Sequence, residues 1–217
     1  MQQWCRKIKN KIRKLVNDAL RYRINRLNRK KLNNRQMTLI ASNCNGCLML
    51  HDLDVRYNSP FVNLFITAED YIRLLQNFEC YMSMELQFPI KCETHYPIGY
   101  IGDVEIHFVH YRDTEEAQKK WNERKKRMDM SNSFVMFTDR DGCTVEHLQA
   151  FDKLPFANKV VFTHDLHPEI KSSCYIAGFE DGDCVGNLHQ YRAWNGMRYY
   201  DTFDYVAWFN GNVDRKE

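Results

Sequence analysis

The sequence lacks the features by which a chain usually enters a membrane or leaves the cytoplasm. No stretch of its 217 residues approaches about 18 consecutive apolar residues, so we expect no transmembrane helix. The N-terminus is positively charged, but no apolar segment follows it, so we expect no secretory signal peptide. Eight cysteines are present, and without such a signal we expect reduced, mostly buried thiols. These absences predict a cytoplasmic protein.

Helix-breaking residues and acids are both scarce near the N-terminus. Neither glycine nor proline interrupts residues 4–32, and apolar residues recur there at helical spacing, which predicts one amphipathic helix. Its apolar stripe consists of Trp4, Ile8, Ile12, Leu15, Val16, Ala19, Leu20, Ile24 and Leu27. Residues 1–35 carry 13 Lys or Arg and one acid, Asp18, for a net charge of +12, whereas the remainder carries 18 Lys or Arg and 27 acids, for a net charge of −9. We therefore divide the chain into a basic helical arm, residues 1–36, and an acidic body, residues 37–217.

The basic arm has three interpretations. Basic flanks beside an apolar stripe that includes Trp4 are typical of a helix on an anionic membrane surface, and this is the partner that we expect for residues 4–32. Nucleic acid would also attract the arm, but aromatics are few there and the acidic body would repel a phosphate backbone. Packing of the stripe on the body or on a partner chain stays open as the third interpretation.

The body alternates short apolar strands with amphipathic helices, which is typical of an α/β fold. Strands are predicted over 38–42, 61–67, 97–101, 104–111, 133–138, 159–163 and 174–177. Helices are predicted over 47–52, 68–82, 114–128 and 144–152. We expect a mainly parallel sheet with helices on both faces, an added antiparallel hairpin that turns at Gly102-Asp103, and an internal seam near residues 129–132.

The strand predicted over 133–138 ends in the acidic motif Asp139-Arg-Asp141. Ligands bind outside the carboxyl ends of parallel strands, and two carboxylates there can hold a divalent metal, Mn²⁺ or Mg²⁺, that neutralises a diphosphate. Many nucleotide-sugar glycosyltransferases carry Asp-x-Asp at such a position. The motif also resembles the nucleophile loop of haloacid-dehalogenase-type phosphatases, although Cys143 interrupts that pattern. A solvated turn that caps the next helix is the structural alternative.

A second motif, Ser42-Asn-Cys-Asn-Gly-Cys47, follows the first predicted strand. Backbone amides at a strand-to-helix turn can bind an anion, which makes Asn43, Asn45 and Gly46 candidate phosphate- or nucleotide-binding residues. Cys44 is a candidate nucleophile at the same turn. A thioredoxin-like Cys-x-x-Cys site is less favoured, because no aromatic residue precedes the first cysteine. A structural turn with a packed thiol is the remaining interpretation.

His164 and Asp165 directly follow the strand predicted over 159–163, so we expect them at the same sheet edge as Asp139. A general base there could activate an acceptor hydroxyl, and either residue is a candidate for this catalytic role. A surface histidine that takes part in no reaction is the alternative.

Seven blocks of sequence together resemble one bacterial protein family. They are residues 42–53, 58–65, 96–100, 105–111, 137–143, 159–164 and 199–208. Members of this family are uncharacterised proteins, often labelled exopolysaccharide (capsule) biosynthesis proteins, and the resemblance spans roughly residues 38–211. It implies an α/β fold, with two lobes as one arrangement, and a setting in surface-polysaccharide assembly, but it supplies no catalytic residues. Glycine often stands at the position of Cys47 in this family, which weakens the redox interpretation.

These observations favour a glycosyltransferase-like transferase that acts on an activated sugar in surface-polysaccharide biosynthesis at the inner membrane face. Asp139 and Asp141 would hold the metal, and a nucleotide-sugar or a lipid-linked saccharide is the expected substrate. A non-catalytic docking or assembly protein of a polysaccharide-synthesis complex is the main alternative. A phosphatase-like enzyme or a Cys-dependent acyl-transfer enzyme, with Asp139 or Cys44 as nucleophile, is a further one.

Overall fold

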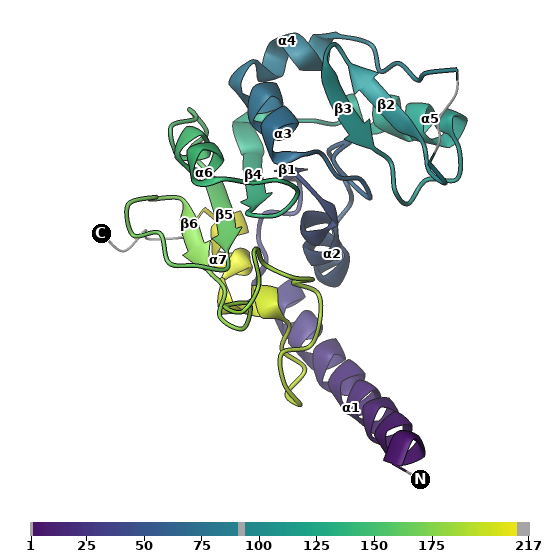
Figure 1. Cartoon of the computed structure of the whole chain (residues 1–217), viewed down its shortest axis with the longest axis vertical. Coiled ribbons are helices and arrows are strands. Elements are labelled where there is room, and N and C mark those ends of the chain that lie inside the picture. The colour runs from purple at the N-terminus through teal and green to yellow at the C-terminus, as the bar shows by residue number, and fades with distance from the viewer. Residues whose placement is uncertain (1, 91–93, 212–217) are drawn as a thin grey trace.

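The computed structural model describes residues 2–90 and 94–211, and its centre is a four-stranded parallel sheet (Figure 1). The strand order is β1-β4-β5-β6, formed by β1 (Thr38–Ala41), β4 (Ser133–Thr138), β5 (Lys159–Thr163) and β6 (Ser173–Tyr175). A separate antiparallel hairpin pairs β2 (Ile98–Ile101) with β3 (Val104–His107). Gly102 supplies the left-handed backbone of its turn, with φ at +59°. The prediction of a mainly parallel α/β fold with an added hairpin is confirmed.

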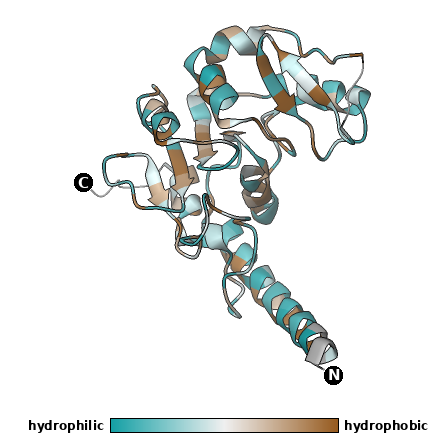
Figure 2. Cartoon of the chain, in the orientation of Figure 1, coloured by the Kyte–Doolittle hydropathy of each residue, from teal (hydrophilic) through white to brown (hydrophobic). Residues whose placement is uncertain are grey.

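The strands of the parallel sheet contribute to two hydrophobic cores, one on each face. In β4, Val135 and Phe137 belong to the first core, whereas Phe134 and Met136 belong to the second. Both faces are therefore buried, which is why the strands read as nearly continuous apolar runs. Figure 2 shows this hydrophobic character in β4 and β5.

Each core is covered by its own helices. The first core packs α3 (Ala68–Gln76), α4 (Phe78–Ser83), α5 (Thr114–Lys125) and α6 (Val145–Asp152). The second core packs α2 (Cys44–Leu53) and α7 (Tyr205–Phe209). Two short 3-10 helices, η1 (Met130–Asn132) and η2 (Tyr199–Thr202), complete the described elements. The predicted seam near residues 129–132 falls on η1, which connects α5 to β4.

The strand predicted over 104–111 ends at His107, and two other predicted elements differ from the structure in kind or continuity. The strand expected over 61–67 is a loop that forms one isolated bridge, between Phe65 and His107, so its apolar residues are buried without joining a sheet. The helix expected over 68–82 is interrupted at Asn77, whose φ of −129° and ψ of 44° do not continue a helix. Hydrophobic spacing predicted that residues 68–82 form amphipathic helix that packs on the core, but it did not predict the interruption at Asn77.

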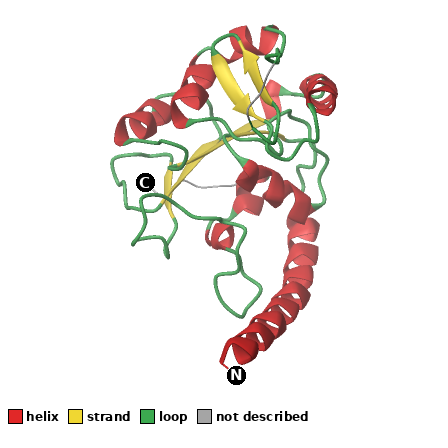
Figure 3. Ribbon diagram, turned by 45° about the vertical axis from the view of Figure 1, so that its right-hand side comes forward, coloured by secondary structure: helices red, strands yellow, loops and turns green. Residues whose placement is uncertain are grey.

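The basic arm is the helix α1 (Gln2–Lys31), which projects from the body with its N-terminal end farthest away (Figure 1, Figure 3). Its C-terminal half lies against the body, where Arg21 is only 3% exposed. Among the described helices, none is both long enough and apolar enough to cross a bilayer.

A cluster of buried charged side chains joins α1 to the body. Arg21 Nη2 lies 2.8 Å from Asp52 Oδ2, and Arg21 Nη1 lies 2.5 Å from Asp201 Oδ2. Arg198 Nη1 lies 3.5 Å from the same Asp52 oxygen, to which the Tyr200 hydroxyl also donates a hydrogen bond. Two arginines thus balance two aspartates in surroundings where an unpaired charge would be strongly unfavourable.

The cysteine side chains that the structure describes are free thiols. They are Cys44, Cys47, Cys80, Cys143, Cys174 and Cys184. Cys92 lies outside the described residues, and so does the side chain of Cys5.

Candidate functional site

Two neighbouring strands send their following helices to opposite faces of the sheet. α2 follows β1 and contributes Met49 and Leu50 to the second core. α6 follows β4, the neighbour of β1, and contributes Leu148 and Phe151 to the first core. The chain therefore diverges at the carboxyl ends of two adjacent parallel strands, and α/β sheets bind ligands in the crevice that such a divergence opens.

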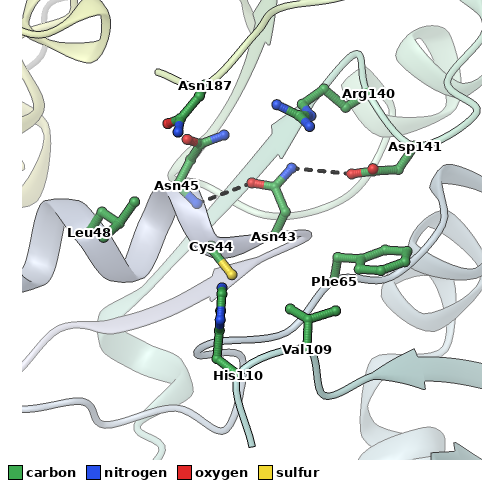
Figure 4. Close-up of a pocket in the computed structure, with 10 residues that line it drawn as sticks. All are labelled: Asn43, Cys44, Asn45, Leu48, Phe65, Val109, His110, Arg140, Asp141 and Asn187. Atoms are coloured by element: carbon green, nitrogen blue, oxygen red, sulfur yellow. Dashed lines mark hydrogen bonds between the residues drawn. The ribbon is translucent and has the colours of Figure 1, made fainter. Parts of the chain in front are cut away.

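A pocket of about 300 Å³ lies at this position (Figure 4). Its lining consists of Asn43, Cys44, Asn45, Leu48, Phe65, Val109, His110, Arg140, Asp141 and Asn187. Carboxamide, carboxylate, guanidinium and imidazole groups stand beside a few apolar side chains, and the volume is at the small end of ordinary ligand sites. The lining suits a compact polar ligand.

Asn43 joins the two strand ends that form the pocket. Its Oδ1 accepts a hydrogen bond of 3.2 Å from the backbone N–H of Asn45, which caps α2 and makes the predicted turn over 43–46 the first turn of that helix. Its Nδ2 donates to Thr138 Oγ1 at 2.7 Å and to Asp141 Oδ2 at 3.4 Å. Asn43 is thereby held between β1 and β4, and the N-terminus of α2 is directed toward the pocket.

Asp141 is the carboxylate that faces the pocket. Its backbone is left-handed, with φ at +58°, and Gly142 follows at +82°, so the chain turns sharply after β4. The Asp141 carbonyl accepts a hydrogen bond of 2.9 Å from Ala68 N, which fixes this turn to the start of α3. Burial raises the pKa of the Asp141 carboxyl above its ordinary value. A carboxyl with a raised pKa in a pocket is suited to proton transfer.

Arg140 supplies the positive charge of the pocket. Figure 4 shows its side chain extending from the loop after β4 toward Asn45. Within the part of the chain that the structure describes, its guanidinium makes no hydrogen bond or ion pair. An arginine that faces a pocket without a protein partner is available to a carboxylate or phosphate group of a ligand.

Asp139 has a different environment from Asp141. Its Oδ2 accepts hydrogen bonds from the His164 backbone N–H at 2.7 Å and contacts His164 Nδ1 at 2.6 Å. Its Oδ1 accepts a hydrogen bond of 2.7 Å from Val185 N. The side chain is 6% exposed and holds β4, β5 and the segment near Val185 together at one edge. Asp139 is therefore a structural partner of His164 beside the pocket and not part of its lining.

His164 and Asp165 lie at the predicted sheet edge. The hydrogen bond to Asp139 raises the pKa of the His164 imidazole, which favours its protonated form. His164 Nε2 also lies 3.3 Å from the Asp165 carboxylate. Both acids favour the protonated form of the imidazole, which cannot accept a proton, and neither His164 nor Asp165 lines the pocket.

The thiols of α2 are held inside the fold. Cys47 Sγ lies 3.1 Å from the Cys44 carbonyl oxygen and 3.3 Å from Asn63 Oδ1, and its one S–H can donate to either. A hydrogen bond with Cys47, together with burial, raises the pKa of the Cys44 thiol far above its ordinary value. Cys44 lines the pocket as a protonated thiol, which does not favour a nucleophilic role.

Gly46 brings α2 close to the sheet. A Cβ atom at this position would lie 2.7 Å from Ala41 Cβ, too near for any side chain without movement. The residue faces β1 and allows the helix to approach it, so its contribution to an anion site would come through helix position. Of the predicted site residues, Asn43, Cys44, Asn45 and Asp141 meet in the pocket.

The predicted metal pair does not present two free carboxylates to one cation. Both oxygens of Asp139 accept hydrogen bonds within the fold, and only Asp141 faces the pocket. Within residues 2–90 and 94–211, no three His, Cys, Asp or Glu side chains are placed together to hold a metal ion. The remaining donors, one carboxylate and nearby carboxamides, fit at most a cation shared with a ligand's phosphates.

Sequence reasoning missed several pocket residues. Arg140 occupied the variable position of the acidic motif, and His110 was expected on a strand. β3 in fact ends at His107, and the loop that follows carries His110 to the pocket. Asn187 comes from a segment without regular structure, for which the sequence has no periodic signal.

Comparison with known proteins shows the family to which the chain belongs. The sequence profile of one family matches residues 15–210. The chain belongs to the family described as "Domain of unknown function (DUF1919)". The matched residues begin within α1 and include every residue that lines the pocket, together with the Arg21 cluster. An "Uncharacterized protein" of Haemophilus influenzae is 49% identical over 200 residues, which cover 92% of this chain and 97% of that protein.

Proposed function

We propose that the protein is a transferase that acts on an activated sugar in surface-polysaccharide biosynthesis, with the pocket between β1 and β4 as its active site. The observation that carries the proposal is the unpartnered Arg140 guanidinium beside the N-terminus of α2. Together these groups provide positive charge for a phosphate or diphosphate. The surface-polysaccharide setting comes from the resemblance of the sequence to bacterial proteins with that label.

In this proposal each pocket residue has a separate task. Arg140 and the first amides of α2 bind the phosphates of the donor, and Asn45 and Asn187 bind sugar hydroxyls. As the acceptor oxygen bonds to the sugar C1 and the bond from C1 to the phosphate oxygen breaks, the nucleotide or lipid phosphate leaves and Asp141 accepts the proton of the acceptor hydroxyl, because its raised pKa makes it a better base than an ordinary carboxylate. His164 fixes Asp139, and with it the loop that carries Asp141.

A divalent cation enters the proposal only together with the donor. Asp141 is the one acidic side chain in the pocket lining and serves as the base, so Mg²⁺ or Mn²⁺ would be held by the diphosphate and by carboxamide oxygens of the pocket. Such a cation would neutralise the leaving group. The guanidinium of Arg140 would also neutralise the negative charge of the leaving group.

The test is thermal melting of the full chain with a panel of nucleotide sugars, each with and without Mg²⁺ or Mn²⁺. A ligand at 100 times its dissociation constant adds about 2.7 kcal/mol to the free energy of unfolding. We expect one donor to raise the melting temperature of the native protein, and Arg140→Met to remove that shift. Arg112→Met is the matched control, because Arg112 does not line the pocket and 81% of its side chain is exposed. Absence of a shift with every donor would reject the proposal.

A non-catalytic docking or assembly protein is the second candidate, and the exposed apolar stripe of α1 favours it. In a strain that lacks the native gene, Asp141→Asn should then restore polysaccharide output fully, whereas substitutions in the stripe should not. The transferase predicts that Asp141→Asn fails. Enzymes with an Asp139 or Cys44 nucleophile are less favoured, since Asp139 is fully hydrogen-bonded and Cys44 is protonated.

A further inference from the structure

The helix α1 turns a polar face toward the body. Asn17 is fully buried: its Nδ2 donates to the Ala193 carbonyl and its Oδ1 accepts from Gly196 N, each at 2.9 Å. One turn further on, Arg21 enters its cluster of buried charges. Asn28 donates to the Tyr205 hydroxyl at 2.9 Å. Hydrogen bonds and ion pairs, and not the apolar stripe, thus attach the helix.

Within residues 4–20 the apolar stripe of α1 is exposed. Trp4 is 68% exposed, Ile12 50% and Leu15 63%, and Ile8 and Val16 are exposed too. At 3.6 residues per turn these positions share one side of the helix, roughly opposite to the side that carries Asn17. Figure 2 shows hydrophobic and hydrophilic residues mixed along the projecting part of α1. An amphipathic helix normally buries its apolar side, so this orientation leaves a surface that needs a partner.

The charge beside the stripe identifies the class of that partner. Residues 4–20 include six Lys or Arg and one acid, Asp18. Asp18 is already engaged, because its carboxylate lies 2.6 Å from Lys14 Nζ and accepts a hydrogen bond of 2.8 Å from the Tyr191 hydroxyl. A second copy of α1 laid along the stripe would bring like charges together, which is unfavourable. Nucleic acid would match the charge but would leave the apolar side chains in water.

We propose that residues 4–20 of α1 lie on an anionic lipid bilayer, with the apolar stripe at the level of the acyl chains. The basic flanks would meet the lipid headgroups. Trp4 is 68% exposed and Tyr22, just beyond this segment, is 70% exposed, and both side chains suit the boundary between headgroups and acyl chains. The body lies on the polar side of the helix, so it does not obstruct the contact. The buried Arg21 cluster keeps the helix fixed to the body. This inference is independent of the pocket and of the proposed transferase activity.

The experiment is flotation of the full chain with vesicles of phosphatidylcholine that contain either 30% or no phosphatidylglycerol. We expect binding to the anionic vesicles, weaker binding in 0.5 M salt and little binding to the neutral vesicles. Ile12→Ser together with Leu15→Ser should lower the partition coefficient about tenfold or more for each side chain lost. Leu166→Ser is the matched control, because Leu166 is 74% exposed on the body and outside α1. All the substituted side chains are exposed, so melting temperatures should stay unchanged.

Three outcomes would overturn the inference. Equal flotation of the stripe variant and the native protein would show that the stripe does not contact lipid. Equal binding to neutral and anionic vesicles would remove the role of charge. Dimerisation in light scattering that the stripe variant abolishes would show that α1 pairs with a second copy. None of these results depends on nucleotide-sugar binding, so failure here is distinct from failure of the pocket proposal.

Discussion

Arg21 of α1 donates two hydrogen bonds to one oxygen of Asp52 in α2, from Nε at 3.2 Å and from Nη2 at 2.8 Å. Both side chains are at most 4% exposed. The N-terminal arm and the helix that forms the pocket are therefore joined by a buried ion pair, to which Asn25 and Arg29 add hydrogen bonds to Asp52. Attachment of the arm depends on this pair more than on any apolar contact.

Replacing Arg21 with Met should destabilise the protein by about 3–5 kcal/mol, because Asp52 and Asp201 would lose their main positive partner inside the fold. Urea unfolding followed by circular dichroism measures this change. Lys14→Met removes an exposed ion pair of the same helix, with Asp18, and should change stability by about 1 kcal/mol or less. Similar effects of the two substitutions would contradict the role given to the buried pair.

The pair of His164 with Asp139 should make stability depend on pH. The folded state raises the pKa of His164, so its stabilisation is complete below the ordinary value of about 6.5 and is lost as pH rises through the folded-state pKa. His164→Asn should therefore cost about 1–2 kcal/mol at pH 5.5 and less at pH 8.5. Unfolding at both pH values measures the difference. NMR titration should show a lower His164 pKa in Asp139→Asn, because the largest contribution that raises this pKa is removed.

Gly46→Ala should destabilise the fold by about 1–3 kcal/mol, because the added methyl group meets Ala41 Cβ at 2.7 Å. Ala41→Gly removes that methyl group from the other side of the contact. The double variant should then be less destabilised than the sum of the two single variants, which thermal unfolding of all four proteins can measure. Strict additivity would show that the two positions do not touch.

Cys44 should react slowly with iodoacetamide at pH 7.5, since its thiol stays protonated. Cys80 is exposed and should be alkylated before Cys44, as peptide mass spectrometry would show. Rapid modification of Cys44 would restore the nucleophile hypothesis.

Asp141→Asn should abolish donor binding or turnover without lowering the melting temperature. Asparagine accepts the same left-handed backbone, and the substitution removes a carboxylate whose burial disfavours its charged form. Differential scanning calorimetry and ligand titration of the same sample measure both effects. A large loss of stability would instead assign Asp141 to the fold.

The sequence predicted the parallel sheet because its strands are apolar on both sides, as Val135 and Met136 show. It also indicated that Asn43 and Asp141 lie at one edge of the sheet, because both follow parallel strands. It could not locate Arg140, whose direction depends on the left-handed turn at the next residue.

Contacts between distant residues were also beyond the sequence. Periodicity identified the apolar stripe of α1 but not which side of the helix meets the body. That choice depends on Arg21 and Asp201, which are 180 residues apart in the chain. No local pattern marks such a pair.

The same separation imposes an order on biosynthesis. Asp201 is synthesised 180 residues after Arg21, so during that interval α1 lacks part of the surface to which it attaches. At about 5–20 residues per second, this interval lasts roughly ten to forty seconds. A basic amphipathic segment is thus free beside the ribosome before the body exists. During that interval the side chains of α1 lack the buried partners that hold the helix in the folded protein.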